Sequence, residues 1–179
     1  APRRADIRSI WVGLRPLVKP QDEDGGNTKS ISREHTVLAS RSGLVTVTGG
    51  KWTTYRAMAE DVLRKCFEVG LLPAKPEGAT THLPLVGTPA GAVAHRMCDP
   101  QGAHSYGSES ALVQAIEGGH EMVAPGLTAA MVRFAARFEY ARTVEDVLAR
   151  RSRLLFLDAA AAIAASPKVA ALLQEELRH

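Results

Sequence analysis

The stretch "VTVTGGKWTTYR", residues 45–56, changes its pattern at a pair of glycines. Before the pair, valines alternate with threonines, which is the two-residue period of a β-strand. After it, apolar residues recur at alternating spacings of three and one from Tyr55 to Phe67, which is one face of an amphipathic helix. The glycines fit a tight strand-to-helix turn. They also let an anion approach the N-terminus of the helix, where Lys51 adds positive charge, so residues 49–53 have two interpretations.

The segments before this junction predict two further strands. In "IRSIWVGLRPLV", residues 7–18, Ile10, Val12 and Leu14 alternate with other residues until prolines end the run. The second candidate is "SISREHTVLAS", residues 30–40, and "SRSG" predicts a hairpin turn into the strand before the glycine pair. That last strand is mostly apolar, which is typical of a buried strand. Residues 1–71 therefore follow the order β-β-β-α.

Beyond this helix, Gly70 and Pro73 mark a stop, and the proline-rich residues 72–107 follow. The rest of the chain is predicted to be helical. Ser108 begins one helix, Thr143 and Asp146 resemble a capping box for another, and Ser166–Pro167 is predicted to start the last. The predicted fold class is α+β, with a short β-rich part at residues 1–71 and an all-α helical domain at residues 72–179.

Composition limits the function classes. The net charge is only +3 and the aromatic fraction only 5%, which argues against nucleic acid as a partner. Two cysteines make no disulfide framework; Cys66 is expected in the core and the compartment is expected to be the reduced cytoplasm. No run approaches the ~20 apolar residues of a membrane span, and the scattered histidines predict no metal site. Because the chain opens without methionine on a strand-like run, it is expected to be a C-terminal fragment.

Few residues are candidates for chemistry. Arg15 lies within an apolar stretch, either as a structural arginine or as a guanidinium clamp for phosphate or carboxylate. Arg33 and His35 share one face of the second strand. Arg150, Arg151 and Arg153 are interpreted as a solvated or ion-paired helix face. Because the chain contains no G-x-S-x-G, Walker or G-x-G-x-x-G motif, it is predicted to be inactive alone.

Four ordered segments carry a resemblance to a known family. The succession "GLRPLV", "SREH", "GLVTVTGGKWTTYRAMAEDV" and "YARTVEDVLARRSRLLFLDA" resembles the C-terminal part of FAD-dependent glycerol-3-phosphate dehydrogenase. The match covers nearly the whole chain. It implies that residues 1–71 are the C-terminal segment of the FAD and substrate domain, and that residues 72–179 are a helical cap. The glycine-rich dinucleotide fingerprint of the family lies N-terminal to this region.

The resemblance also implies roles for particular residues. Arg15, Arg33 and Lys51 match family positions expected near bound glycerol 3-phosphate. Gly49, Gly50, Lys51, Trp52 and Thr53 match the segment that brings a helix N-terminus to the pyrimidine edge of FAD, where it stabilises negative charge. The catalytic general base is not identified; His35 is a poor candidate because the family also has tyrosine at its place.

The implied reaction oxidises sn-glycerol 3-phosphate to dihydroxyacetone phosphate, with electrons passing to quinone. A homodimer and peripheral association of the intact enzyme with the inner face of the cytoplasmic membrane are further expectations. Two alternatives stay open. One is an oxidase that passes electrons to dioxygen, and the other is a non-catalytic helical interaction module.

Overall fold

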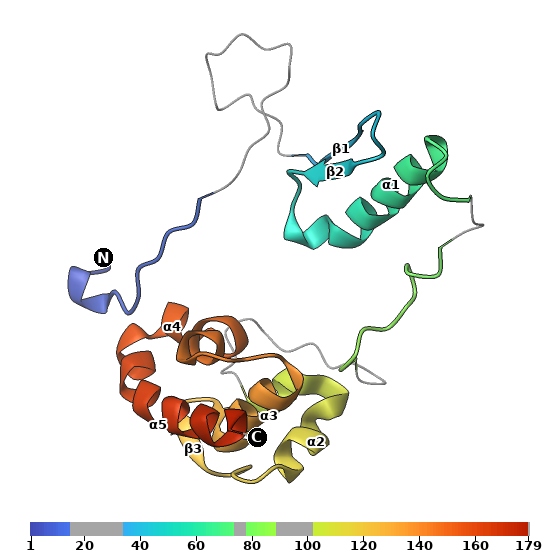
Figure 1. Ribbon diagram of the computed structural model, residues 1–179. Helices are drawn as coiled ribbons and strands as arrows, with labels where there is room; N and C mark the ends of the chain where they lie inside the picture. The colour runs from blue at the N-terminus through green and yellow to red at the C-terminus, as the bar shows by residue number, and fades with distance from the viewer. Residues whose placement is uncertain (15–33, 74–77, 89–101, 179) are drawn as a thin grey trace. The chain divides into compact units, whose positions relative to one another are not determined.

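The computed structural model describes residues 1–14, 34–73, 78–88 and 102–178 (Figure 1). They belong to two compact units. We call residues 13–83 the hairpin–helix unit, and residues 1–12 together with 84–179 the helical unit. The chain is mostly helical α+β, with two small two-stranded sheets.

The hairpin–helix unit contains β1 (Thr36–Ala39), β2 (Val45–Thr48), the 3₁₀ turn η2 (Trp52–Thr54) and α1 (Tyr55–Glu68). The strands are antiparallel, with Thr36 opposite Thr48. Gly43 turns the hairpin at φ 85°, and its amide donates to the Ser40 carbonyl at 3.1 Å. The two strands, the turn and the helix predicted between residues 30 and 70 are confirmed.

The burial predicted for this unit is wrong. Leu44 is 66% and Val47 44% exposed, and Cys66 is half-buried rather than in a core. No residue among the described parts of the hairpin–helix unit is fully buried. A two-stranded hairpin packed against one helix is covered on one face only, so even an apolar strand of this unit keeps a solvent-exposed side.

The first predicted strand is also absent from the described residues. Residues 7–14 follow the short 3₁₀ helix η1 (Arg4–Asp6) without regular secondary structure, and residues 15–18 lie outside the described residues. Arg8 and Ser9 instead bind α4 and α5 within the helical unit: Ser9 Oγ donates to the Leu155 carbonyl at 2.7 Å and the Ala159 amide donates to the Arg8 carbonyl at 3.1 Å. A strand needs a ladder partner, and Val12, which is 91% exposed, has none among the described residues.

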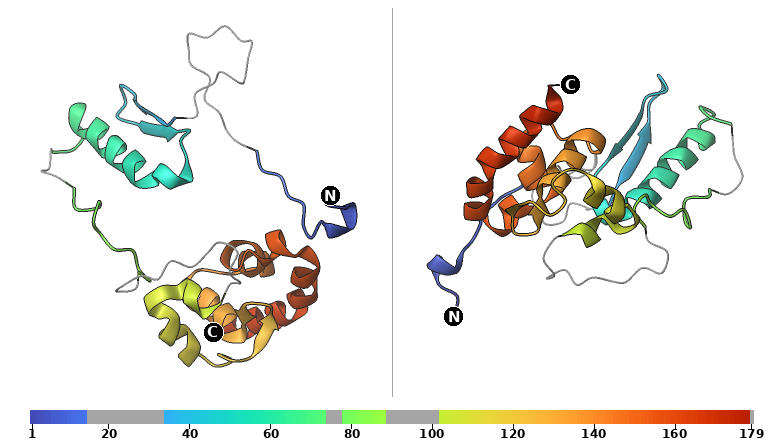
Figure 2. Two further views of the ribbon diagram at one scale, coloured as in Figure 1. Left: turned by 180° about the vertical axis from the view of Figure 1, so that it is seen from behind. Right: turned by 90° about the horizontal axis from the view of Figure 1, so that it is seen from below.

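The helical unit holds the hydrophobic core. Its elements are η3 (Ala103–Glu109), α2 (Ser110–Ala115), β3 (Met122–Ala124), β4 (Leu127–Thr128), α3 (Ala129–Phe138), the π-helix η4 (Asp146–Arg151), α4 (Leu154–Leu157) and α5 (Ala159–Leu177). Figures 1 and 2 show α5 alongside α3. The largest fully buried side chains come one each from α2, α3, η4 and α5, and they are Val113, Val132, Val147 and Val169.

This unit is not all-α as predicted. β3 and β4 form an antiparallel hairpin around Pro125–Gly126, where Gly126 adopts φ 75°. The sequence predicts no strand here, because segments of three and two residues are too short to show a period. The first helix also begins later than Ser108, since a 3₁₀ segment precedes α2.

The last helix starts eight residues earlier than predicted, at Ala159 rather than Pro167. α5 begins at Ala159, with the Asp158 carboxylate accepting from the Ala161 amide at 3.0 Å, and Pro167 lies inside it. Proline has no amide to donate to the Ile163 carbonyl four residues back. The Ser166 hydroxyl donates to that carbonyl at 2.8 Å instead. The alanine-rich run before Ser166 favours helix strongly enough to extend it through the proline.

The predicted cap at Thr143 is confirmed. Its hydroxyl accepts from the Asp146 amide at 3.1 Å, and Asp146 Oδ2 accepts from the Thr143 amide at 2.9 Å. The single helix predicted after it is interrupted, because the π-helix η4 ends at Arg151 and Arg153 adopts φ 56° before α4. Arg150 is ion-paired with Glu145 and Asp146, in agreement with the predicted ion-paired face.

Candidate functional site

The predicted site residues fall partly within the described residues. Gly49, Gly50, Lys51, Trp52 and Thr53 form the connection between β2 and α1 in the hairpin–helix unit. Arg15 and Arg33, predicted to bind substrate, lie outside the described residues. Their role stays a prediction.

Both glycines at the junction are required by geometry. Gly49 and Gly50 adopt φ 77° and 81°, in the left-handed region that favours glycine. A Cβ on Gly49 would lie 2.6 Å from the Glu34 carbonyl oxygen, and one on Gly50 would lie 2.7 Å from the Met58 sulfur. The glycines are therefore explained by the turn and by close packing, whatever else binds beside them.

The helix that follows begins without a side-chain cap among the described residues. Lys51 is extended at the N-cap of η2, and the amide and hydroxyl of Thr54 both donate to its carbonyl at 3.0 Å. Neither the Lys51 side chain at the N-cap of η2 nor the Thr54 side chain at the N-cap of α1 accepts from the amides that follow it. Uncapped amides at a helix start carry partial positive charge, and Lys51, which is exposed, directly precedes them in the chain.

An open cavity of about 380 Å³ lies against this junction. The backbone of the two glycines and Lys51 forms one part of its lining, and mostly apolar side chains form the rest: Val47, Trp52, Tyr55, Met58, Ala59 and Val62. The Trp52 and Tyr55 rings lie 5.7 Å apart, and Trp52 is 87% exposed. Such a surface suits a flat apolar ring that presents electron-rich atoms to the uncapped amides.

Two features of this region were missed by the sequence analysis. Tyr55 and Met58 were assigned to a core-facing stripe, but they line the cavity. His35 Nε2 and Asp61 Oδ2 lie 2.6 Å apart, which joins the residue before β1 to the middle of α1. Their 26-residue separation follows no local period, so no sequence signal pairs them.

Other kinds of site are not found among the described residues. They contain no cluster of three or more histidine, cysteine, aspartate or glutamate side chains that could hold a metal ion. Across the same part of the chain, no helix is long and apolar enough to cross a membrane.

Comparison with known proteins decides the family. The family described as the C-terminal domain of alpha-glycerophosphate oxidase matches residues 78–179, more than half of the chain. The chain belongs to this family.

Individual proteins similar to this chain extend the match from residues 78–179 to almost the whole chain. A mitochondrial glycerol-3-phosphate dehydrogenase of Arabidopsis thaliana is 37% identical over 97% of the chain, and one of Rattus norvegicus is 37% identical over 98%. A probable enzyme of the same name from Caenorhabditis elegans is 36% identical over 98%. The chain spans 32%, 26% and 27% of these relatives, about a third of their length or less. No solved structure matches the chain significantly.

These findings confirm the resemblance to glycerol-3-phosphate dehydrogenase and correct the expected location. The three relatives are named as mitochondrial proteins, which contradicts the expectation of the cytoplasm or the inner face of the cytoplasmic membrane. That expectation rested mainly on a low cysteine count, which indicates a reducing environment and does not distinguish one reducing compartment from another.

Proposed function

We propose that the chain is the C-terminal part of an FAD-dependent glycerol-3-phosphate dehydrogenase that acts in mitochondria. The observation that carries this proposal is 36–37% identity to enzymes named mitochondrial glycerol-3-phosphate dehydrogenase over 97–98% of the chain. The reaction is oxidation of the C2 hydroxyl of sn-glycerol 3-phosphate to the ketone of dihydroxyacetone phosphate. When bound, FAD supplies the acceptor for the two electrons.

The junction at residues 49–53 has the properties that a flavin ring requires. The cavity beside it has apolar walls, and the two glycines place backbone without side chains at its edge. The uncapped amides of η2 and the Lys51 ammonium provide positive charge where the ring carries electron-rich atoms. Residues 49–53 would hold the pyrimidine edge of the flavin, with Trp52 and Tyr55 beside the ring.

Binding of the substrate phosphate is assigned to Arg15, Arg33 and Lys51. A phosphate dianion pairs well with several cations, because charge-assisted hydrogen bonds are the strong ones and guanidinium matches phosphate with two parallel donors. In the described part, Lys51 is exposed at the edge of the cavity and has no acidic partner among the ion pairs observed there. It is therefore available for an anionic ligand.

The chain alone is proposed to be inactive, because it contains no G-x-G-x-x-G fingerprint to bind the FAD pyrophosphate. The 179-residue chain, mixed with FAD, glycerol 3-phosphate and a redox dye, should reduce no dye, whereas the full-length enzyme that carries this chain should. Dye reduction by the chain alone would contradict the proposal.

Lys51→Ala in the full-length enzyme tests the site. Loss of a charged phosphate contact should cost about 2–4 kcal/mol of transition-state binding, which corresponds to a fall in kcat/KM of roughly 30- to 1000-fold. Lys65→Ala is the matched control, because Lys65 lies on α1 in an exposed pair with Glu68, away from the cavity lining. Equal kinetics of the two variants would remove Lys51 from the site.

The electron acceptor has two candidates. Quinone is the first candidate because the relatives are named dehydrogenases. Dioxygen is the second because the description of the matched family names an oxidase. Oxygen uptake by the full-length enzyme, measured with and without a soluble quinone, separates them. A homodimer stays a prediction.

A further inference from the structure

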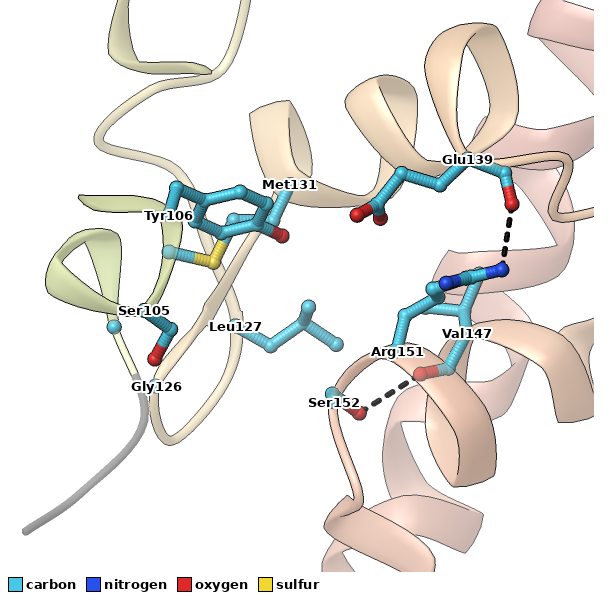
Figure 3. Close-up of a pocket in the computed structure, with 10 residues that line it drawn as sticks. Ser105, Tyr106, Gly126, Leu127, Met131, Glu139, Val147, Arg151 and Ser152 are labelled. Atoms are coloured by element: carbon cyan, nitrogen blue, oxygen red, sulfur yellow. Dashed lines mark hydrogen bonds between the residues drawn. The ribbon is translucent and has the colours of Figure 1, made fainter. Parts of the chain in front are cut away.

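A second cavity, of about 120 Å³, lies in the helical unit (Figure 3). Residues of η3, the β3–β4 hairpin, α3 and η4 line it, together with Glu139 after α3 and Ser152 after η4. Ser105, Tyr106, Glu139 and Arg151 provide polar groups, and Leu127 and Met131 provide apolar surface. The cavity belongs to no function assigned above.

Two polar groups in this cavity lack protein partners within the described residues. Figure 3 shows the Glu139 carboxylate and the Tyr106 hydroxyl pointing toward the space between them, and the structure records no hydrogen bond to either in the described part. Burial raises the pKa of Tyr106 to about 12 and raises the pKa of Glu139, although Arg151 opposes both shifts. Both groups still reach solvent, since neither is among the buried unpartnered polar atoms of the described residues, so hydroxyl groups of a ligand can take the place of water there.

The Arg151 guanidinium is fixed at the edge of the same cavity. Its Nη2 donates to the backbone carbonyl of Glu139 at 2.7 Å, which leaves its other N–H groups for a ligand. Neighbouring Ser152 is held by the preceding helix η4, since its hydroxyl donates to the Val147 carbonyl at 2.9 Å.

The backbone around the cavity is strained at two places. Tyr140 and Arg153 have φ of 60° and 56°, and they are the non-glycine residues with positive φ in the described part of the chain. Each comes directly after a lining residue, Glu139 or Ser152. Between them lies the π-helix η4, which contributes Val147 and Arg151 to the lining. Left-handed non-glycine residues and π-helices both concentrate at functional sites.

We propose that this cavity binds a small neutral polyol of three or four carbons. An anion is disfavoured by the Glu139 carboxylate and a cation by Arg151, so the charges select a neutral molecule. A hydroxyl group donates to the carboxylate and accepts from Tyr106 or Arg151, which satisfies both kinds of group at once. Leu127 and Met131 contact the carbon chain, and the volume admits only a few carbon atoms. The flavin proposal is not needed for this inference.

The test uses nuclear magnetic resonance on the 179-residue chain at pH 7 and constant ionic strength. Glycerol, inorganic phosphate and methylammonium are titrated separately while backbone amide shifts are followed. Glycerol should cause saturable shifts at Tyr106, Leu127 and Arg151, with β1 and β2 unchanged, and the two ions should cause none there. Linear shifts throughout the chain, absence of shifts, or saturation by either ion would overturn the proposal.

Variants test the groups that carry the proposal. Tyr106→Phe keeps the ring that packs on Phe134 with centroids 5.3 Å apart, and it should weaken glycerol binding about tenfold. Glu139→Gln should weaken it as well, because the amide is a poorer acceptor. Tyr140→Phe is the matched control: its ring is 79% exposed and outside the lining, so binding should be unchanged. Equal affinities of Tyr106→Phe, Glu139→Gln and the control would also overturn it.

Discussion

Glu176, near the end of α5, ties this helix to α3. Its carboxylate accepts from Arg133 at 2.8 Å and from both Nε and Nη2 of Arg137, at 2.5 and 2.7 Å. The Glu176 side chain is 9% and that of Arg133 12% exposed, so both charges are largely removed from water. Glu176→Gln keeps the size and removes the charge, which leaves the Arg133 guanidinium poorly compensated.

The pKa of Glu176 gives the magnitude. Hydrogen bonds from Arg137, and then those from Arg133, lower the pKa of Glu176 from 4.5 to about 2. At ~1.4 kcal/mol for each pKa unit, this corresponds to about 3 kcal/mol of stability at neutral pH. Because Arg137 is 43% exposed, water screens part of the interaction, and we expect Glu176→Gln to lower the free energy of unfolding by about 2 kcal/mol.

The direction of the pH effect follows from the lowered pKa. A carboxylate whose pKa is lower in the folded state stabilises the fold fully when the pH is above its pKa in the unfolded chain, here about 4.5. This stabilisation is lost as the pH falls through the folded-state pKa of about 2. Urea unfolding followed by circular dichroism at 222 nm measures the difference between wild type and Glu176→Gln. The difference should be about 2 kcal/mol at pH 7 and should fall to a small fraction of that at pH 2, where about half of the Glu176 carboxylates are protonated.

The matched control is Glu175→Gln, since Glu175 also binds Arg133 at 2.8 Å but is 58% exposed. Its effect at pH 7 should stay below about 0.5 kcal/mol. Equal effects of the two variants, or a Glu176→Gln effect that does not change with pH, would refute the assignment of the interaction to a desolvated charge pair.

Two further predictions concern backbone geometry. Gly49→Ala should destabilise the hairpin–helix unit more than Gly70→Ala. Both glycines have positive φ, which costs an alanine about 1–2 kcal/mol of strain. Only at Gly49 would the new Cβ also clash with backbone, whereas at Gly70 no atom lies within 4 Å of it. Thermal loss of the β1 and β2 amide signals measures this, and equal losses would argue against close packing at the junction. Ser166→Ala should cost α5 about 0.5–1 kcal/mol by leaving a carbonyl without a donor, and this cost should disappear in a Pro167→Ala background, where the amide is restored. A cost that persists there would show that the hydroxyl acts elsewhere.

The sequence predicted local structure where a period or a cap was decisive. α1 carries a full apolar stripe and a glycine stop, and the Thr143 cap is a reciprocal hydrogen-bonded pair, so both followed from short-range rules. The start of α5 could not be predicted in this way, because the alanine-rich run favours helix while Ser166–Pro167 is typical of a helix start. The Ser166 hydroxyl decides between them, since it donates to the carbonyl that the proline leaves without a donor.

The sites show the same division. The glycine pair, Lys51 and their place before a helix were visible in the sequence, whereas the apolar wall at Tyr55 and Met58 depended on which face of α1 stays uncovered. The cavity at Tyr106 and Glu139 joins residues 33 positions apart through a π-helix and two left-handed residues. Neither feature has a sequence period, so it required the fold.

The most direct test of the flavin assignment is the two-electron midpoint potential of FAD in the full-length enzyme that carries this chain. If the Lys51 ammonium and the helix start face the flavin, removing the charge in Lys51→Met destabilises the reduced, more negative form by about 1.4 kcal/mol, which is roughly 30 mV. The potential should fall by about that amount in Lys51→Met and stay near wild type in Lys51→Arg. The same potential in all three proteins would contradict the placement of residues 49–53 at the flavin.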